Sequence, residues 1–404
     1  MNLPVAMVDP REPAFVRDPY PTYAALRARG PAVQWPALGF PVLTRHAEVN
    51  ALLRDRRFGR QILHKVPREA LGWPAPAPHL AAFDAFERHS LLELEPPEHT
   101  RIRALVHPPF VPRRIAALEA SIAALAHELV DGFIDRGRCE LLDDFARHLP
   151  VLVIAGFLGV PRAMAPQLLA WSHDMVAIYQ VRRDRAIEDH AEAATRAFTA
   201  WMREELAARR AAPGDDVLSQ LIAARTPQGE SLSTDELVTT AILLLNAGHE
   251  ATVHAIGNGV ASLLAERPAD GVAHFLADPV TVGEEMLRFD APLHLFTRYA
   301  LEPVEVAGLP LRPGDRIGLL LGSANRDADR FTEPARFDAA RSPNPHVAFG
   351  AGIHACVGAP LARLELRTAV RVLFERLGAP RLEAVPPVAD TWHFRGRTAV
   401  ALRW

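Results

Sequence analysis

The chain has 404 residues, 49% of them hydrophobic, and 45 Lys and Arg against 48 Asp and Glu give a formal net charge of −3. This length supports a large core, whereas the nearly balanced charge gives no support for binding to nucleic acid or to a membrane surface. The two cysteines, Cys139 and Cys356, are too few for a disulfide framework, so we expect a protein of the reducing cytoplasm.

The first ninety residues begin and end with irregular segments. Residues 1–17 contain neither an apolar signal sequence nor a membrane anchor, and we interpret them as an N-terminal extension. A short helix over 19–30 and extended segments over 32–42 are predicted to follow. Between 58 and 90, four prolines and mixed polarity predict a long loop region, and long loops in compact domains are usually functional or mobile.

Helical patterns dominate the middle of the chain, over 113–136, 143–158, 162–179 and 184–210. The longest candidate runs from 234 to 265, roughly 45 Å at 1.5 Å per residue. Ser233 and Glu236 are spaced for a capping box at its start. So many helices, with only short strand candidates, predict a mainly α fold with small β-sheets in a single domain.

A histidine and an arginine share one face of a shorter predicted helix. Pro96 and Pro97 open this helix, and His99 and Arg103 are four residues apart. Two such donors could bind a carboxylate together. For the pair considered alone, a solvated basic face is the more common explanation.

The middle of the longest helix reads Ala247-Gly248-His249-Glu250-Ala251-Thr252. A glycine inside a helix costs about 1 kcal/mol relative to alanine, which suggests the close approach of another group at Gly248. His249 and His254 look like part of a zinc motif. However, they are five residues apart and point about 140° away from each other, so we exclude a shared zinc ion.

The last third combines a charged helix with short strands. Glu285 and Arg288 are three residues apart, a spacing that in general indicates only a weak exposed ion pair. Strands are predicted over 293–298, 304–306 and 316–321. Residues 391–394 are expected to form the tip of a hairpin.

The stretch from Phe349 to Arg363 combines glycines with Cys356 directly before a strongly helical segment. Glycines at 350 and 352 permit backbone conformations that direct peptide N–H groups at one atom. A thiolate at the start of a helix is stabilised by N–H groups and by the helix dipole, and Gly358 leaves space for a large flat group. A cysteine held in this way can be an axial haem ligand, whereas a lone cysteine in a loop is more often structural.

This stretch resembles the haem-binding signature of the cytochrome P-450 family, Phe-Gly-x-Gly-x-His-x-Cys-x-Gly-x-x-Leu-Ala-Arg, at every defined position. The resemblance extends in motif order over most of the chain and implies the fold of the soluble bacterial type, with a long central helix over haem b. It makes Cys356 the iron ligand. It also implies that 58–90 is a substrate-access region.

The same resemblance implies which residues contact the cofactor. Propionate contacts are expected from a His and an Arg on the helix that begins near residue 98, from one arginine on a strand and from one histidine near the cysteine. The implied cofactor-binding residues are His99, Arg103, Gly248, Arg298, Phe349, Gly350, His354, Cys356 and Gly358.

On the long helix, the family pattern Ala-Gly-x-Glu/Asp-Thr supplies an acid and an alcohol that deliver protons for dioxygen activation. Glu250 matches the acid, but Ala251 occupies the alcohol position, and Thr252 follows about 100° further around the helix. We hypothesise that the substrate provides the missing group. Local unwinding that lets Thr252 take the role is the alternative.

Two further residue sets follow from the resemblance. One is a structural triad of Glu285, Arg288 and Arg336, the last from the segment Pro334-Ala335-Arg336-Phe337. The other is a mostly apolar substrate pocket lined by Leu244, Leu293, His294, Leu295, Phe296 and Phe394. The histidines His294 and His393 suggest recognition of an acidic group, although both could equally be packed in the core.

The resemblance therefore implies a monooxygenase of secondary metabolism that inserts one oxygen atom from O2 into a small hydrophobic substrate. A ferredoxin or flavodoxin with its reductase would supply electrons, docking near Arg101, Arg113, Arg114 and Arg363, and we expect a monomer. Two alternatives stay open at this point. One is a haem-thiolate enzyme that uses peroxide or catalyses coupling, dehydration or rearrangement, and the other is a binding protein without turnover.

Overall fold

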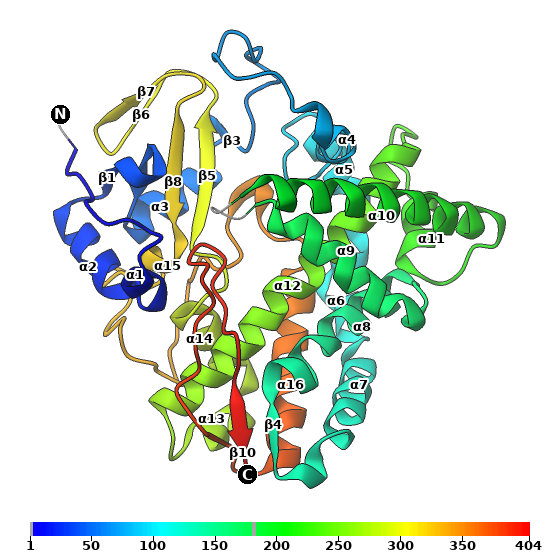
Figure 1. Ribbon diagram of the computed structural model, residues 1–404, viewed down its shortest axis with the longest axis vertical. Coiled ribbons are helices and arrows are strands. Elements are labelled where there is room, and N and C mark those ends of the chain that lie inside the picture. Colours follow the sequence, from blue (N-terminus) through cyan, green and yellow to red (C-terminus); the bar gives the residue numbers. More distant parts are fainter. Residues whose placement is uncertain (1–2, 180–182) are drawn as a thin grey trace. The chain divides into compact units, whose positions relative to one another are not determined.

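The computed structural model describes residues 3–179 and 183–404, and the chain divides into two compact units. The first unit comprises residues 1–66, 119–148 and 251–404, and the second comprises 67–118 and 149–250. Helices dominate both, as Figure 1 shows, and the predicted mainly α fold with small sheets is confirmed. The interpretation as a single domain stays a prediction, and we describe each unit by itself.

The main sheet of the first unit has the strand order β1-β2-β8-β5-β3. Its strands are β1 (Ala32–Trp35), β2 (Phe40–Leu43), β8 (Arg316–Leu320), β5 (Leu295–Ala300) and β3 (Phe58–Gly59). Only β2 and β8 run parallel, and β8 has four successive buried residues because it is central. The register pairs Phe296 with Leu319 and Arg298 with Ile317, which fixes the direction of the side chains on β5.

Two smaller sheets, of order β4-β10-β9 and β6-β7, complete the strands of the first unit. They consist of β4 (Arg138–Glu140), β10 (Ala401–Arg403), β9 (Arg381–Leu382), β6 (Val304–Val306) and β7 (Leu309–Leu311). The predicted hairpin near the C-terminus is present, since Val388 pairs with Arg397 and the Thr391 hydroxyl donates to the Phe394 carbonyl at 2.9 Å. Its returning arm pairs Phe394 with Leu293, next to β5.

Two helices of the first unit, α14 and α16, hold the cysteine stretch. The helices of this unit are α1 (Pro13–Arg17), α2 (Tyr20–Arg29), α3 (His46–Arg54), α7 (Glu119–Asp131), α13 (Gly271–Ala277), α14 (Pro279–Phe289), α15 (Leu321–Ala324) and α16 (Ala359–Leu377). α14 begins where Asp278 accepts a hydrogen bond from the Thr281 N–H and Pro279 occupies the first turn. Its buried face packs against α16, as both lie in the same core.

The second unit is built almost entirely from helices. They are α4 (Ala81–Glu87), α5 (Glu98–Val106), α6 (Pro112–Ala116), α8 (His148–Leu158), α9 (Ala165–Ala177), α10 (Arg185–Ala211), α11 (Val217–Ala223) and α12 up to Glu250. α10 begins at Asp184, whose carboxylate accepts from the Ile187 N–H at 2.9 Å. Trp171 of α9 packs on Phe198 of α10 with ring centroids 5.0 Å apart, which holds these long helices side by side (Figure 1).

The longest helix, α12 (Thr234–Glu266), begins with the predicted capping box. The Ser233 N–H donates to Glu236 at 2.8 Å, and the Glu236 N–H donates to the Ser233 hydroxyl at 3.2 Å. The helix contributes residues up to Glu250 to the second unit and residues from Ala251 to the first. It is helical without a break across this point.

The N-terminal interpretations need correction. Met1 and Asn2 of the predicted extension lie outside the described residues, but residues 3–17 belong to the first unit: Phe15 is buried, and the Trp35 indole donates to the Val8 carbonyl at 2.7 Å. The loop region predicted for 58–90 holds for 60–77 and 88–90. It is wrong for 58–59, which form β3, and for 78–87, which form a 3₁₀ turn and α4. This helix begins because Glu192 of α10 accepts from the N–H groups of Ala82 and Phe83.

No helix within 3–179 and 183–404 combines the length and apolar character that crossing a membrane requires.

One buried carboxylate joins distant parts of the first unit. Asp290, at the end of α14, accepts from the Tyr20 hydroxyl at 2.6 Å, from Arg395 at 2.7 Å and from Arg397 at 2.8 Å. Burial alone would raise the pKa of Asp290, but the charges of Arg395 and Arg397 outweigh it and hold the pKa far below its ordinary value. The C-terminal hairpin is therefore tied to α2 and α14 through one ionised side chain.

Replacement of this carboxylate should be severely destabilising. We expect Asp290→Asn to lower the free energy of unfolding by about 3 kcal/mol, because two nearly buried guanidinium groups lose their counter-ion. Urea denaturation followed by circular dichroism measures this. Asp270→Asn, which removes an exposed partner of Arg267, is the control and should change stability little. Equal losses in the two variants would contradict the role given to Asp290.

Candidate active site

The cysteine stretch forms a tight loop in the first unit. Gly350 and Gly352 have φ angles of +65° and +73°, the left-handed region that favours glycine. At Gly352 a Cβ atom would also lie 2.2 Å from the carbonyl oxygen of Leu53 in α3, so no side chain fits there. The Cys356 N–H closes the loop by donating to the Phe349 carbonyl at 3.0 Å.

The loop presents the Cys356 thiol at the start of α16. Cys356 is exposed, whereas Cys139 is buried in β4. Gly358 is the N-cap of α16, and Pro360 lies in its first turn. A Cβ atom at Gly358 would meet only the Cys356 sulfur within 4 Å, at 3.9 Å, among the residues described. The space beside the sulfur is therefore left open by the chain's own packing, which fits a flat group bound to that sulfur.

Strand β5 brings two predicted cofactor contacts to the same loop. A Cβ atom at Gly350 would lie 3.2 Å from the ring of Phe296, so this ring packs on the loop backbone. The guanidinium of Arg298 lies 5.8 Å from the centre of the same ring and is 3% exposed. His354 lies within the loop itself, in the 3₁₀ turn Gly352–His354. The first unit thus gathers Cys356, Arg298 and His354 around one loop.

A carboxylate that the sequence analysis missed holds both ends of this loop. Glu284 of α14 accepts from Arg363 at 2.7 Å and 2.9 Å, and from His346 at 3.0 Å. His346 precedes the loop and Arg363 follows it. The Arg363 guanidinium also lies 4.5 Å from the centre of the Phe349 ring. Glu284 lies directly before the motif residue Glu285, and its sequence context alone carried no signal of this role.

The neighbouring carboxylate, Glu285, forms the predicted ion pair with Arg288, with N–O distances of 2.7 Å. The prediction for the third member, Arg336, is wrong. The Arg336 side chain is 59% exposed and pairs with Glu333, and only its carbonyl accepts from Arg288. Arg341 takes the place beside Glu285, at 3.1 Å and 8% exposed. The reason is geometric, because the turn at 338–341 directs Arg341 inward: the Asp338 N–H donates to Glu285 at 2.8 Å.

The predicted substrate-pocket residues separate into different environments. His294 is fully buried, and its Nδ1 lies 3.0 Å from the Tyr23 hydroxyl, so the proposal that it recognises an acidic group is corrected in favour of core packing. Burial lowers the pKa of His294 to about 3, and the charge of Arg395 adds to this effect, so the ring is neutral. Leu295 packs in the cluster around Trp35, whereas Leu293 and Phe296 pack in the cluster around Leu319.

In the second unit, α5 carries the predicted pair His99 and Arg103. His99 is 2% exposed and Arg103 is half-buried, and the two lie one turn apart on the same helix face. Leu244 of α12 is also buried in this unit. These residues and the cysteine loop belong to different units, and the assignment of His99 and Arg103 to propionates stays a prediction.

The α12 motif residues of the second unit make two contacts that the sequence did not predict. A Cβ atom at Gly248 would lie 2.9 Å from Ile154 of α8, so helix packing favours a glycine here, and its role in cofactor binding stays a prediction. Glu250 is half-buried, and its carboxylate lies 3.4 Å from Nε2 of the buried His249. His249 in turn donates from Nδ1 to the Leu245 carbonyl at 3.0 Å.

Comparison with known proteins decides the family. The profile described as "Cytochrome P450" matches residues 281–388. The monooxygenase PikC of Streptomyces venezuelae is 35% identical, over 96% of this chain and 92% of its own. The 6-deoxyerythronolide B hydroxylase of Saccharopolyspora erythraea is 35% identical, over 91% and 90% respectively. The chain belongs to the cytochrome P-450 family.

Solved structures agree with this P-450 assignment. The structure of BioI in complex with an acyl carrier protein ligated to hexadec-9Z-enoic acid has a TM-score of 0.89 and 31% identity, over 97% of this chain and 99% of that one. The protein is a monooxygenase whose cofactor is haem b. The exposed thiol of Cys356, with the open space at Gly358, fits its axial ligation. The alternative of a binding protein without turnover loses its support.

Two of the arginines expected to attract a redox partner are already neutralised. In the first unit Arg363 is bound by Glu284, and in the second unit Arg101 is bound by Glu236. Arg113 and Arg114 of α6 are exposed, and Arg114 donates to Gln220 at 2.5 Å. Of the four, only Arg113 and Arg114 offer positive charge that no carboxylate of the described residues balances.

The thiol assignment has a direct spectroscopic test. We expect Cys356→Ala and Cys356→His to lose the thiolate-type Soret band of the ferrous carbon monoxide complex, because no other exposed thiol exists in the sequence. Cys139→Ala is the matched control and should keep the band. Survival of the band in either Cys356 variant would refute the assignment.

The contacts of Glu284 with His346 and Arg363, which we call the Glu284 clamp, should make the free energy of unfolding depend on pH. Burial alone would raise the pKa of Glu284, but hydrogen bonds from His346 and Arg363, and their charges, outweigh it and lower the pKa to about 2. Because the pKa of Glu284 is lower in the folded state, the ionised carboxylate stabilises the fold at pH values above the unfolded-state pKa near 4.5. This stabilisation is lost as the pH falls toward 2. We therefore expect Glu284→Gln to cost of the order of 2 kcal/mol at pH 7.

Urea denaturation between pH 7 and pH 3 checks this, with Glu305→Gln on β6 as the control. The stability difference between wild type and Glu284→Gln should shrink as pH falls below about 4.5. A difference that stays constant with pH would show that Glu284 acts through packing and not through its charge.

Proposed function

We propose that this P-450 inserts one oxygen atom from O2 into a hydrophobic molecule of moderate size that carries an oxygen-containing group near the oxidised carbon. When bound, haem b supplies the binding and activation of O2. A separate ferredoxin or flavodoxin with its reductase supplies the electrons, because the chain carries no flavin or iron–sulfur motif. A monomeric state and a cytoplasmic location stay predictions.

The activities and ligands named for similar proteins support this substrate class. The vitamin D(3) 25-hydroxylase of Pseudonocardia autotrophica is 37% identical over 89% of this chain. A similar structure contains myristic acid, at 35% identity and a TM-score of 0.87. Each molecule named is largely apolar and carries an oxygen function.

The observation that carries the proposal is Ala251 within an unbroken α12. A methyl group neither donates nor accepts a hydrogen bond. Thr252 is 4% exposed, and in a regular helix its side chain points about 100° away from that of Ala251. Helix unwinding, which would let Thr252 replace the missing hydroxyl, is not present. The last hydrogen bond to the reacting oxygen therefore falls to the substrate or to a water that the substrate holds.

Glu250, the acid directly before Ala251, has a neighbouring histidine as a partner for proton transfer. His249 keeps its Nδ1 proton on the Leu245 carbonyl, which directs Nε2 toward Glu250. Nε2 lies 3.4 Å from the Glu250 carboxylate, so the two side chains are direct neighbours. Because Glu250 is half-buried, it can exchange protons with solvent and also hold them next to Ala251. We propose Glu250 as the proton donor and His249 as the residue that positions it.

A second candidate is oxidative bond formation without hydroxylation. One similar structure, at 30% identity and a TM-score of 0.83, is of an enzyme for C–S bond formation. Such chemistry would also tolerate an alanine at 251. Use of peroxide is less favoured, since the branch of the family that uses it characteristically lacks the acid that Glu250 provides.

The proposal is tested by measuring coupling, which is the amount of product formed per reduced cofactor consumed. Thr252→Ala should keep coupling within about twofold of wild type, whereas a substrate analogue without the oxygen function should uncouple the wild-type enzyme at least tenfold. Ala251→Thr is the informative partner variant. Because it restores a hydroxyl at the family position, it should recover coupling with the deoxy analogue.

Two results would overturn substrate assistance. One is the collapse of coupling in Thr252→Ala, and the other is efficient turnover of the deoxy analogue by wild type. A product that contains no oxygen atom from labelled O2 would instead favour the second candidate.

A further inference from the structure

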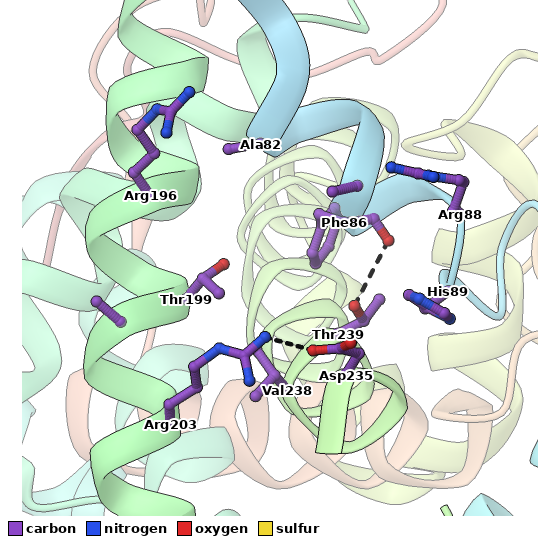
Figure 2. A pocket seen from close by; sticks show the side chains of 12 residues that line it. Ala82, Phe86, Arg88, His89, Arg196, Thr199, Arg203, Asp235, Val238 and Thr239 are labelled. Atoms are coloured by element: carbon purple, nitrogen blue, oxygen red, sulfur yellow. Dashed lines mark hydrogen bonds and ion pairs between the residues drawn. The ribbon is translucent and has the colours of Figure 1, made fainter. Parts of the chain in front are cut away.

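A groove in the second unit lies between α4, α10 and the first turns of α12. Figure 2 shows α10 on one side, with Arg196, Thr199 and Arg203, and α4 and α12 on the other. Its volume is about 630 Å³, within the ~300–1,000 Å³ typical of small-molecule sites. Its lining consists of Ala82, Ala85, Phe86, Arg88, His89, Arg196, Thr199, Ala200, Arg203, Asp235, Val238 and Thr239.

The floor of the groove is apolar and closed. Phe86 is 6% exposed and Val238 is 2% exposed. The Thr239 hydroxyl donates to the Phe86 carbonyl at 3.5 Å, which joins α12 to the end of α4 beneath the groove (Figure 2). Ala85 and Ala200 also line the groove, and both are exposed residues with small side chains. An apolar chain can therefore be bound along the bottom.

The rim of the groove is positively charged. It carries Arg88, His89, Arg196 and Arg203 against a single lining carboxylate, Asp235. Arg203 pairs with Asp235, and both side chains stay about half exposed, at 47% and 54%. Among the described residues Arg88 pairs with no carboxylate, and its side chain donates only to the Asp84 carbonyl at 3.4 Å.

The remaining arginine is only partly neutralised. Arg196 pairs with Glu192, but that carboxylate already accepts from the N–H groups of Ala82 and Phe83 at the start of α4. The Arg196 side chain remains 63% exposed. A ligand carboxylate bound here would thus meet three arginines and compete with the carboxylates of Asp235 and Glu192.

The groove is separate from the residues of the reaction. Thr239 precedes Glu250 by eleven residues on α12, which corresponds to about 16 Å along the helix at 1.5 Å per residue. The arginines of the rim are thus separated from Glu250 by several turns of helix. The mechanism proposed above uses none of the groove residues.

We propose that this groove is a second binding site, for an amphipathic carboxylic acid. Its carboxylate lies at the rim, where the charges of Arg203 and Arg88 attract it, and its alkyl chain lies on Phe86 and Val238. Asp235 weakens this binding, because it competes with the ligand for Arg203. Occupancy bridges α4 to α10, so the bound acid acts as an effector that stabilises the position of α4. This inference goes beyond the proposed function and does not rest on it.

Equilibrium dialysis of the haem-loaded enzyme with labelled dodecanoate tests the site. Dodecanol is the uncharged analogue, and a haem-spectral titration in parallel reports binding beside the iron. We expect Arg203→Gln and Arg88→Gln each to weaken the dialysis-detected site about tenfold. Asp235→Asn should strengthen it several-fold, a result that a merely structural role for these residues does not produce.

Two further variants make the test specific to the groove. Ala200→Trp fills the groove from an exposed position of α10 and should abolish this site while the spectral titration stays unchanged. Arg185→Gln removes an arginine of the same helix that pairs with Asp189 outside the groove, and it should have no effect. The proposal is overturned if dodecanol binds as tightly as dodecanoate, if Ala200→Trp binds normally, or if wild type shows no saturable site apart from the one reported by the haem.

Discussion

Two adjacent carboxylates on α14 hold the segment that presents the catalytic thiol. Glu285 points into the core, where Arg288, Arg341 and the Asp338 N–H surround it, while Glu284 binds His346 and Arg363 on either side of the cysteine loop. Because both carboxylates are on one helix, α14 holds the stretch from 338 to 363 at several points, and α3 and β5 pack on its middle. An exposed thiol in a loop needs this constraint if it is to ligate iron with a defined geometry.

Ion pairs of buried residues in the first unit join segments that are distant in sequence. Asp290 links the N-terminal helix α2 to the C-terminal hairpin through Tyr20, Arg395 and Arg397. An isolated carboxylate at such a place would be costly, so each of these residues depends on the others. The same neighbourhood explains why His294 is neutral and packed, although its position on the approach to β5 suggested a role in recognition.

In the second unit the polar groups serve two separate purposes. His249 and Glu250 form a contact suited to moving protons, next to a position where the family's hydroxyl is replaced by Ala251. About four turns earlier on the same helix, Asp235 pairs with Arg203 of α10, and the two lie at the arginine-rich rim of the groove, over an apolar floor. One long helix therefore supports both a reaction site and a groove with the chemistry to bind an acid.

The sequence by itself determined the mainly α fold, the family, the capping box of α12 and the absence of a hydroxyl at 251, because each depends on residue type and local spacing. Tertiary structure decided the rest. The choice of Arg341 over Arg336 depends on which way a turn directs two nearby arginines, and packing against Ile154, almost a hundred residues away, favours a glycine at 248. The clamp by Glu284 and the groove beside α4 arise only when distant helices pack together, and no local pattern records which side chains then meet.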